Sequence, residues 1–139
     1  MRDIKFRALR DDISNCTFVY GDLLLNNGHP IIVSQVDRNY IGTTDVGAGS
    51  HWHIETPAYK VIPETVGQYT GLKDDNDVEI YEGDIIKFLS ISVDKPVLVE
   101  WNDDICQFQF SDGQPINNDD TYGIYKMVIG NIHTNKDLL

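Results

Sequence analysis

Short runs of β-branched and aromatic residues, separated by clusters of glycine, asparagine and aspartate, recur along this chain. Such runs are typical of β-strands, and the small polar residues between them favour turns. No long stretch combines a helical repeat of apolar residues with capping residues. We therefore predict an all-β, mainly antiparallel fold with short helices at most. The expected strands cover residues 4–8, 18–20, 31–33, 85–91, 97–101, 106–110 and 124–132, and a short helical turn is expected at 135–139.

The clearest local prediction is a β-hairpin whose loop spans residues 74–77, because this segment is rich in aspartate and asparagine and lies between two strand-like runs. Gly83 then precedes the expected strand at 85–91. A glycine there permits the close backbone approach that strong curvature demands. We therefore predict that residues 78–133 form a small curled sheet or a barrel.

The length and composition favour one domain. With 139 residues, of which 41% are apolar, the chain can bury one sizeable core. We expect a single domain over residues 1–139, subdivided into a variable, loop-rich N-terminal part (1–60) and a barrel-like part (61–139). The segment 42–50 is small, polar and rich in glycine, so we expect a mobile or partner-ordered loop there rather than core.

The charge of the chain is strongly negative and unevenly distributed. Its 22 acidic and 11 basic residues give a formal charge of −11, which disfavours direct binding of nucleic acid through a wide basic face. Arg2, Lys5, Arg7 and Arg10 lie near the start, whereas residues 74–84 hold six carboxylates and no base. A basic end and an acidic middle can meet within one chain or between subunits. The alternative is a solvated acidic surface that favours solubility.

Nothing in the sequence indicates secretion or membrane insertion. The first residues lack the apolar run of a signal peptide, and no apolar stretch approaches the length of a membrane span. Cys16 and Cys106 lie far apart and match no zinc pattern, so we expect two buried thiols in a reducing cytoplasm, with a disulfide between them left open.

Five segments follow one another in an order that is not generic. They are residues 4–8, 66–74, 79–85, 99–101 and 128–132. In this order and spacing the chain resembles the YopX proteins of bacteriophages and prophages. Residues 63–87 carry most of the likeness, and residues 9–60 carry little. The resemblance implies a small β-rich protein of the bacterial cytoplasm that tends to oligomerise and has no established biochemical activity, and it supplies no catalytic residues.

The shared residues are candidate binding residues, for which we expect a mainly structural role. Their glycines suit positions that need a positive φ or a close strand approach, and their aromatic residues suit a half-buried β core. The candidates are Gly67, Gln68, Tyr69, Gly71, Glu82, Gly83, Asp84 and Trp101.

Two histidines are weak candidates for metal ligands. His51 and His53 would project from one face of a strand, and two imidazoles so placed can share a zinc or copper ion. A third ligand would have to come from elsewhere in the chain, and a surface or interface role is favoured. We predict no metal and no cofactor.

The acidic run that begins at Asp74 superficially resembles a calcium loop. It lacks the glycine at the sixth position and the glutamate at the twelfth position that an EF-hand requires. A solvent-exposed hairpin tip is therefore the favoured interpretation.

No catalytic signature is present, so we predict that the protein is not an enzyme. The chain contains neither a nucleophile elbow nor a phosphate-binding loop, and its many carboxylates make any chosen pair uninformative. Tyr122, Tyr125, Phe108 and Phe110 could form a stacking platform for single-stranded nucleic acid, but neighbouring aspartates oppose it. We expect Phe108 and Phe110 to pack in the core.

The favoured function is that of a non-enzymatic, oligomeric phage or prophage accessory protein. Its β scaffold would present an acidic surface and a variable N-terminal region to a protein partner, and exposed edge strands or the basic first strand could pair between subunits. The alternative is an acidic mimic of nucleic acid that occupies the basic site of a host DNA-binding protein.

Overall fold

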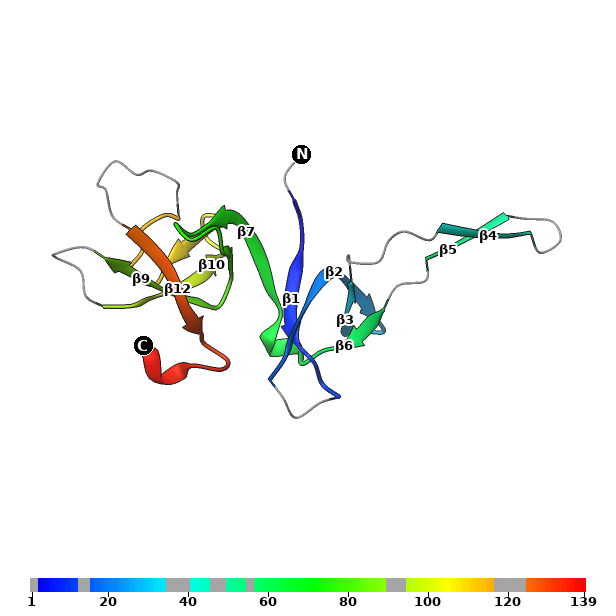
Figure 1. Cartoon of the computed structure of the whole chain (residues 1–139), viewed down its shortest axis with the longest axis horizontal. Helices are drawn as coiled ribbons and strands as arrows, with labels where there is room; N and C mark the ends of the chain where they lie inside the picture. The colour runs from blue at the N-terminus through cyan, green and yellow to red at the C-terminus, as the bar shows by residue number, and fades with distance from the viewer. Residues whose placement is uncertain are drawn as a thin grey trace. The chain divides into compact units, whose positions relative to one another are not determined.

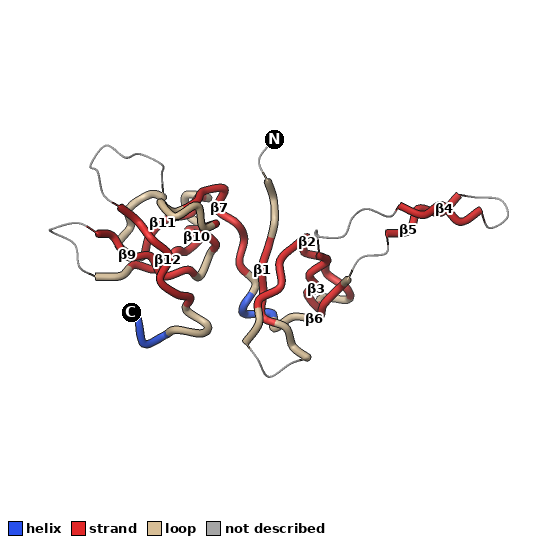
Figure 2. Tube along the Cα trace, viewed as in Figure 1, coloured by secondary structure: helices blue, strands red, loops and turns tan. Residues whose placement is uncertain are grey.

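The computed structural model describes residues 3–12, 16–34, 41–45, 50–54, 57–89, 95–116 and 125–139, and for 41–45 and 50–54 it describes the backbone. In these ranges the chain consists of strands joined by turns, with two 3-10 helices, η1 (Pro63–Thr65) and η2 (Lys136–Leu138) (Figure 2). The all-β prediction and the predicted helical turn near the C-terminus are confirmed. Within the described ranges, no helix has the length and apolar character needed to cross a membrane.

The chain divides into two compact units, Lys5–Val66 and a second unit of Met1–Ile4 with Gly67–Leu139. In the first unit four antiparallel strands pair in the order β6-β3-β2-β1 (Figure 1). Their bounds are β1 (Phe6–Leu9), β2 (Phe18–Asn26), β3 (His29–Ser34) and β6 (Ala58–Lys60).

The sheet of the first unit curls strongly. After β6 the chain returns to the end of β1, where Asp11 N–H donates to Lys60 O over 3.1 Å and Ile62 N–H donates to Leu9 O over 2.9 Å. The concave side buries a small core. Ala8, Ile32 and Val61 form its centre, and Phe6, Val19, Leu23 and Val66 pack against them.

A separate two-stranded hairpin joins β4 (Ile41–Asp45) to β5 (Ser50–Ile54), with Ile41 opposite Ile54 and Asp45 opposite Ser50. The predicted loop at 42–50 is therefore wrong for residues 42–45 and 50, while residues 46–49 lie outside the described residues. Thr43 and Thr44 are β-branched and have high strand propensity, which outweighs the glycine content on which the loop prediction depended.

The second unit contains a hairpin and a four-stranded antiparallel sheet. The hairpin pairs β7 (Gly67–Lys73) with β8 (Glu79–Tyr81), as predicted. The sheet has the order β11-β10-β9-β12, from β9 (Asp84–Leu89), β10 (Val97–Asn102), β11 (Gln107–Phe110) and β12 (Tyr125–Asn131) (Figure 1). Over the described residues the outer strands β11 and β12 do not pair, so the sheet is curled and open rather than a closed barrel.

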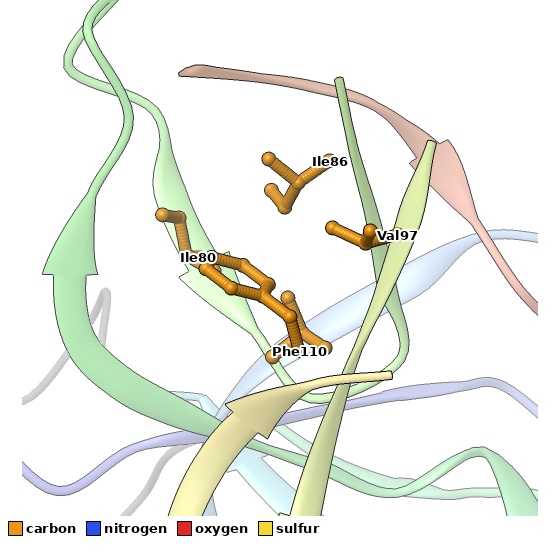
Figure 3. Close-up of a cluster of buried hydrophobic side chains, with 5 residues drawn as sticks. Ile80, Ile86, Val97 and Phe110 are labelled. Atoms are coloured by element: carbon orange, nitrogen blue, oxygen red, sulfur yellow. The ribbon is translucent and has the colours of Figure 1, made fainter. Parts of the chain in front are cut away.

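Side chains from four strands meet in the core of the second unit. Figure 3 shows Ile80 of β8, Ile86 of β9, Val97 of β10 and Phe110 of β11 directed toward one another. Val99 completes this buried cluster. Full burial of each such side chain contributes about 1.5–3 kcal/mol. This core fixes the strands that carry the site described below.

Candidate functional site

Among the described residues of the second unit, the most exposed large aromatic side chain belongs to a cross-strand pair. Trp101 of β10 lies directly opposite Phe108 of β11, and their ring centroids are 5.0 Å apart in an edge-on arrangement. Trp101 remains 41% exposed. On the same strands Val99 and Phe110 also lie opposite each other and are buried in the core. The aromatic pair therefore continues the row of core side chains out to the surface.

The sequence predictions for these aromatic residues are partly correct. Phe110 is buried in the core, as predicted. Phe108 is only partly buried and contacts Trp101, which the prediction of a core position missed. Tyr125 is exposed and its hydroxyl donates to Asn76 Oδ1, while Tyr122 lies outside the described residues. The buried position of Phe110 means that it cannot contribute to a stacking platform.

A hollow of about 240 Å³ lies beside this aromatic pair. Leu72 and Ile116, which line it, also pack against the core cluster, so its floor is the margin of the core. The full lining consists of Gln68, Thr70, Leu72, Trp101, Cys106, Gln107, Phe108, Pro115 and Ile116. Sequence reasoning identified Gln68 and Trp101 as candidates and missed the others. No local pattern could have joined them, because they come from β7, the β10–β11 hairpin and the segment after β11.

The turn between β10 and β11 holds the indole of Trp101 in place. Trp101 Nε1–H donates to Asp103 Oδ1 over 2.9 Å, and the Cys106 thiol donates to Asp103 O over 3.5 Å. Asn102 Oδ1 accepts from Asp104 N–H over 2.9 Å, which is the side-chain contact typical of an asparagine turn. These bonds restrain the Trp101 side chain.

Two carboxylate residues contact residues that line the hollow. Asp103 contacts the indole, and Glu82 N–H donates to Gln68 O over 3.0 Å, which places Glu82 beside a lining residue. Burial raises the pKa of the Glu82 carboxyl, a backbone hydrogen bond from Gln68 lowers it, and the negative charge of Asp103 raises it further. The described residues that line the hollow include no lysine, arginine, aspartate or glutamate. The hollow is therefore lined by uncharged side chains, and these two acidic residues lie next to them.

The turn from Tyr81 to Asp84 has a structural role. Tyr81 N–H donates to Asp84 Oδ2 over 2.8 Å, and Asp84 is buried. Gly83 has a φ of 83°, its N–H donates to Val99 O, and its carbonyl accepts from Ile132 N–H, both over 2.8 Å. The turn is thus hydrogen-bonded both to β10 and to the end of β12.

The remaining motif residues also support the hairpin. A Cβ at Gly67 would lie 2.6 Å from Glu82 O, so a side chain does not fit there. Gly71 has a φ of 89°. Tyr69 and Tyr81 are both buried with ring centroids 5.4 Å apart. Of the eight candidate residues, only Gln68 and Trp101 line the hollow. The other six do not line it, in keeping with the mainly structural role expected for them.

The acidic hairpin tip contacts β12 through Asp74 and Asp75, while Asp75, Asn76 and Asp77 remain exposed. Asp74 is buried, its Oδ1 accepts from Asn76 and Val78 N–H over 2.8 and 2.9 Å, and its Oδ2 accepts from Val128 N–H over 2.9 Å. Asp75 Oδ2 accepts from Lys126 N–H over 2.5 Å. The prediction of a solvent-exposed tip is therefore wrong for Asp74 and confirmed for Asp75, Asn76 and Asp77. Its oxygens satisfy backbone donors of a strand edge, which a neighbouring strand would otherwise do.

Two of the basic residues near the start, Arg7 and Arg10, make contacts within the first unit. Arg7 is buried with its guanidinium 4.7 Å from the centre of the Phe18 ring. Arg10 is paired with Asp12 and lies over the ring of Tyr59, 4.6 Å from its centre. The hydrogen bond between them lowers the pKa of Asp12 and raises the pKa of Arg10.

The thiol and metal predictions have different outcomes. Cys16 and Cys106 are both free and exposed, so the prediction of buried thiols is wrong. Cys106 lies in the turn before β11 with a φ of 52°, so it does not occupy the strand position expected for it.

His51 and His53 lie on β5 opposite Thr44 and Gly42, and their side chains lie outside the described residues. Elsewhere in the described chain, no three His, Cys, Asp or Glu side chains are grouped to hold a metal ion.

Comparisons with known proteins identify the family. No curated protein sequence matches the chain. The crystal structure of protein EF1440 from Enterococcus faecalis is similar, with a TM-score of 0.60 and 24% identity over 100% of this chain and 99% of that chain, which shows a shared fold. The family model described as YopX protein matches residues 5–139. This match spans nearly the whole chain, and the chain therefore belongs to the YopX family.

Proposed function

We propose that this protein is a non-enzymatic binding scaffold that recognises a protein partner through the hollow beside Trp101 and Phe108. In the setting that the family resemblance implies, it is a phage or prophage accessory protein of the bacterial cytoplasm, and the partner is a host protein. The observation that carries the proposal is an exposed tryptophan that extends the core to the surface and is fixed there by Asp103.

A fixed aromatic side chain at the surface is well suited to binding. Tryptophan is enriched among the residues that dominate protein–protein interfaces, where its truncation often costs about 2 kcal/mol or more. Because hydrogen bonds already hold Trp101, little side-chain entropy is lost when a partner covers it. The polar and charged groups at the margin of the hollow would exclude water around the aromatic contact.

Self-association is the second part of the proposal. The β12 edge is occupied by Asp74 and Asp75, and Phe110 N–H of β11 donates to Gln114 O over 2.8 Å, so simple pairing of these edges is disfavoured. The first unit offers a different surface. Tyr20 and Leu24 are 47% and 55% exposed. They lie on one face of β2, since Leu24 follows Tyr20 at an even offset along the strand. We assign this face to subunit contact.

The net charge of −11 favours one alternative function, mimicry of nucleic acid. Two carboxylates of the acidic run weigh against it. Asp74 and Asp84 are buried and accept hydrogen bonds from backbone N–H groups, so they act as internal acceptors rather than as outward phosphate-like charges. Binding through Trp101 is therefore the favoured function.

The experiment compares tagged wild-type protein with two variants, Trp101→Ala and Leu89→Ala, in a bacterial lysate at low and high salt. Leu89 is a matched control, because it is exposed and apolar and does not line the hollow. We expect one protein to copurify with the wild type and the Leu89 variant and to be lost from the Trp101 variant. Equal recovery with all three would contradict the proposal, and loss at high salt from all three would instead favour mimicry.

A further inference from the structure

We infer that a pocket in the first unit binds an α-ammonium group joined to an apolar side chain, as at the N-terminus of a peptide or in a free apolar amino acid. The pocket lies between the β2–β3 hairpin and the segment that follows β6, and its volume is about 530 Å³. A pocket of this size suits a small ligand. The described residues that line it all belong to the first unit, so the inference is independent of the role proposed for Trp101.

The pocket opens where the ladder between β3 and β6 ends. The last pair of the ladder is Ile31 with Lys60, and the same register places Pro30 opposite Val61. Proline has no N–H group to donate to a facing strand, so a regular ladder ends at it. The chain after Lys60 instead pairs with the end of β1, and the pocket lies between this segment and the start of β3.

The backbone carbonyl of Val61 has no donor at this point. Val61 lies opposite Arg10, and the hydrogen bonds of this pairing, 3.1 and 2.9 Å long, are made by the residues on either side. The carbonyl of Val61 therefore points away from β1 and toward Pro30, which cannot donate. Val61 is buried, and within the described ranges no group donates to its carbonyl. A buried carbonyl in this state favours a ligand that donates a hydrogen bond.

Charged side chains form part of the rim of the pocket. Asp11, Lys60 and Glu64 line it and are exposed, and in the described part of the chain none of these side chains forms a hydrogen bond or an ion pair. Two carboxylates and one ammonium group favour a ligand with a positive charge. An ammonium group carries three N–H donors, so it can bond to a carboxylate and to the carbonyl of Val61 together.

The floor of the pocket is apolar. Pro30 and Val61 are buried, and Ile31 and Ile62 are partly buried beside them. A branched or aromatic side chain can cover this floor while an ammonium group one carbon away meets the charged rim. Burial of a leucine side chain there would strengthen binding about tenfold or more. A lysine side chain has no such group beside its charge and would leave most of the floor uncovered.

The test uses the full ¹⁵N-labelled chain, in which the backbone N–H signals of Asp11 and Ile62 report on the pocket. The ligand is Leu-Gly-Gly-amide with a free N-terminus. Three further peptides each lack one feature: acetyl-Leu-Gly-Gly-amide lacks the ammonium group, Gly-Gly-Gly-amide lacks the apolar side chain, and acetyl-Gly-Lys-Gly-amide carries its ammonium group at the end of a stem. We expect saturable shifts with the first peptide, at an affinity about fivefold or more above that of each of the others.

Free leucine distinguishes the two sources of an α-ammonium group. Its carboxylate can bind to Lys60, which the peptide amide cannot imitate. Tighter binding of leucine than of Leu-Gly-Gly-amide would support the site and assign it to a free amino acid. Weaker binding of leucine would support the site and assign it to a peptide N-terminus.

Charge variants separate the pocket from general attraction to an acidic protein. Asp11→Asn and Glu64→Gln each remove one carboxylate of the rim, and Asp11→Asn keeps the backbone N–H that bonds to Lys60 O. Asp137→Asn is the matched control, because Asp137 is exposed and does not line the pocket. We expect each rim variant to weaken binding of Leu-Gly-Gly-amide about two- to fivefold and the control to leave it unchanged.

Several outcomes would overturn the inference. Equal binding of the acetylated leucine peptide would reject the ammonium group, and equal binding of the glycine or the lysine peptide would reject the apolar side chain beside it. Equal weakening by the rim variants and the control would reduce the effect to general attraction. Absence of any shift at millimolar concentrations would reject the site. The lysate experiment with Trp101→Ala concerns the other unit, so the proposed function stands or falls separately.

Discussion

The carboxylate of Asp74 accepts a hydrogen bond from the backbone N–H of Val128 over 2.9 Å and so joins the β7–β8 hairpin to the edge of β12. The same side chain closes its own turn through Asn76 and Val78. An acidic residue thereby protects an edge strand from further pairing, which is one of the ways in which β proteins avoid aggregation. Part of the negative charge of this chain thus stabilises the fold.

Asp74→Asn should destabilise the protein by roughly 2–4 kcal/mol, because hydrogen bonds to a buried charged acceptor contribute about 1.5–3 kcal/mol each and an amide would place an N–H group against a backbone donor. Urea unfolding measures the change. Asp77→Asn is the matched control, since Asp77 is exposed and paired only with exposed Lys73. The control should change stability by less than about 1 kcal/mol. Equal effects of the two variants would contradict the structural role of Asp74.

Gly67→Ala should cost about 1–3 kcal/mol or more, because the new Cβ would lie 2.6 Å from Glu82 O and the backbone would have to shift. Gly113→Ala is a useful comparison. At Gly113 nothing lies within 4 Å, and the penalty of about 1–2 kcal/mol comes from the positive φ alone. Thermal unfolding followed by circular dichroism measures both. A stable Gly67→Ala protein with an unchanged β7–β8 hairpin would refute the close approach.

Glu82→Gln should stabilise the protein at neutral pH. Burial raises the pKa of Glu82 above the ordinary value of 4.5 for a glutamate, so the folded state binds a proton more tightly than the unfolded state. Stability then falls as the pH rises from the unfolded pKa through the folded pKa, where the buried carboxyl must ionise. Glutamine removes this penalty. Urea unfolding at pH 7 should therefore show a gain that disappears below pH of about 4, where both forms are neutral.

A gain of equal size at both pH values would mean that the charge of Glu82 is not its cause. Glu64→Gln controls for the general reduction of negative charge, because Glu64 is exposed. It should change stability little at either pH.

Leu24→Asp should shift the protein toward the monomer, because it places a charge on the exposed apolar face of β2 to which we assign subunit contact. Light scattering coupled to size-exclusion chromatography measures the mass over a range of concentrations. Ile105→Asp provides the control, since Ile105 is 54% exposed in the second unit. A monomeric wild type, or an oligomer that both variants leave intact, would contradict the assignment.

Local sequence features predicted most of the strands, though not β4, β5 and β6. They also predicted the hairpin at 74–77 and the structural roles of Gly67 and Gly83, because each depends on propensity or on backbone conformation. The contacts of Asp74 could not be predicted in the same way. Its partner Val128 is 54 residues away, and an aspartate in a turn has the same local pattern whether its carboxylate faces solvent or a strand edge. The tertiary contact with β12 determines which of these two positions the carboxylate takes.

The binding hollow shows the same limit. Alternation along β10 predicts that Val97, Val99 and Trp101 share a face, and the structure places the first two in the core. The pattern cannot say that the core ends before Trp101. Similarly, the strand-like run around Cys106 gave no sign that Asn102 and Asp103 would close a turn that exposes the thiol.

The two exposed cysteines allow the most direct test of partner binding at Trp101. In a Cys16→Ser protein, a benzophenone attached to Cys106 lies at the lining of the hollow, whereas in a Cys106→Ser protein the same label at Cys16 lies in the other unit. Photocrosslinking in a bacterial lysate, followed by mass spectrometry, identifies what each label contacts. We predict one partner protein captured from Cys106 alone, and lost when Trp101→Ala is added. Capture of the same proteins from both positions, or capture that persists without Trp101, would contradict a binding site at this hollow.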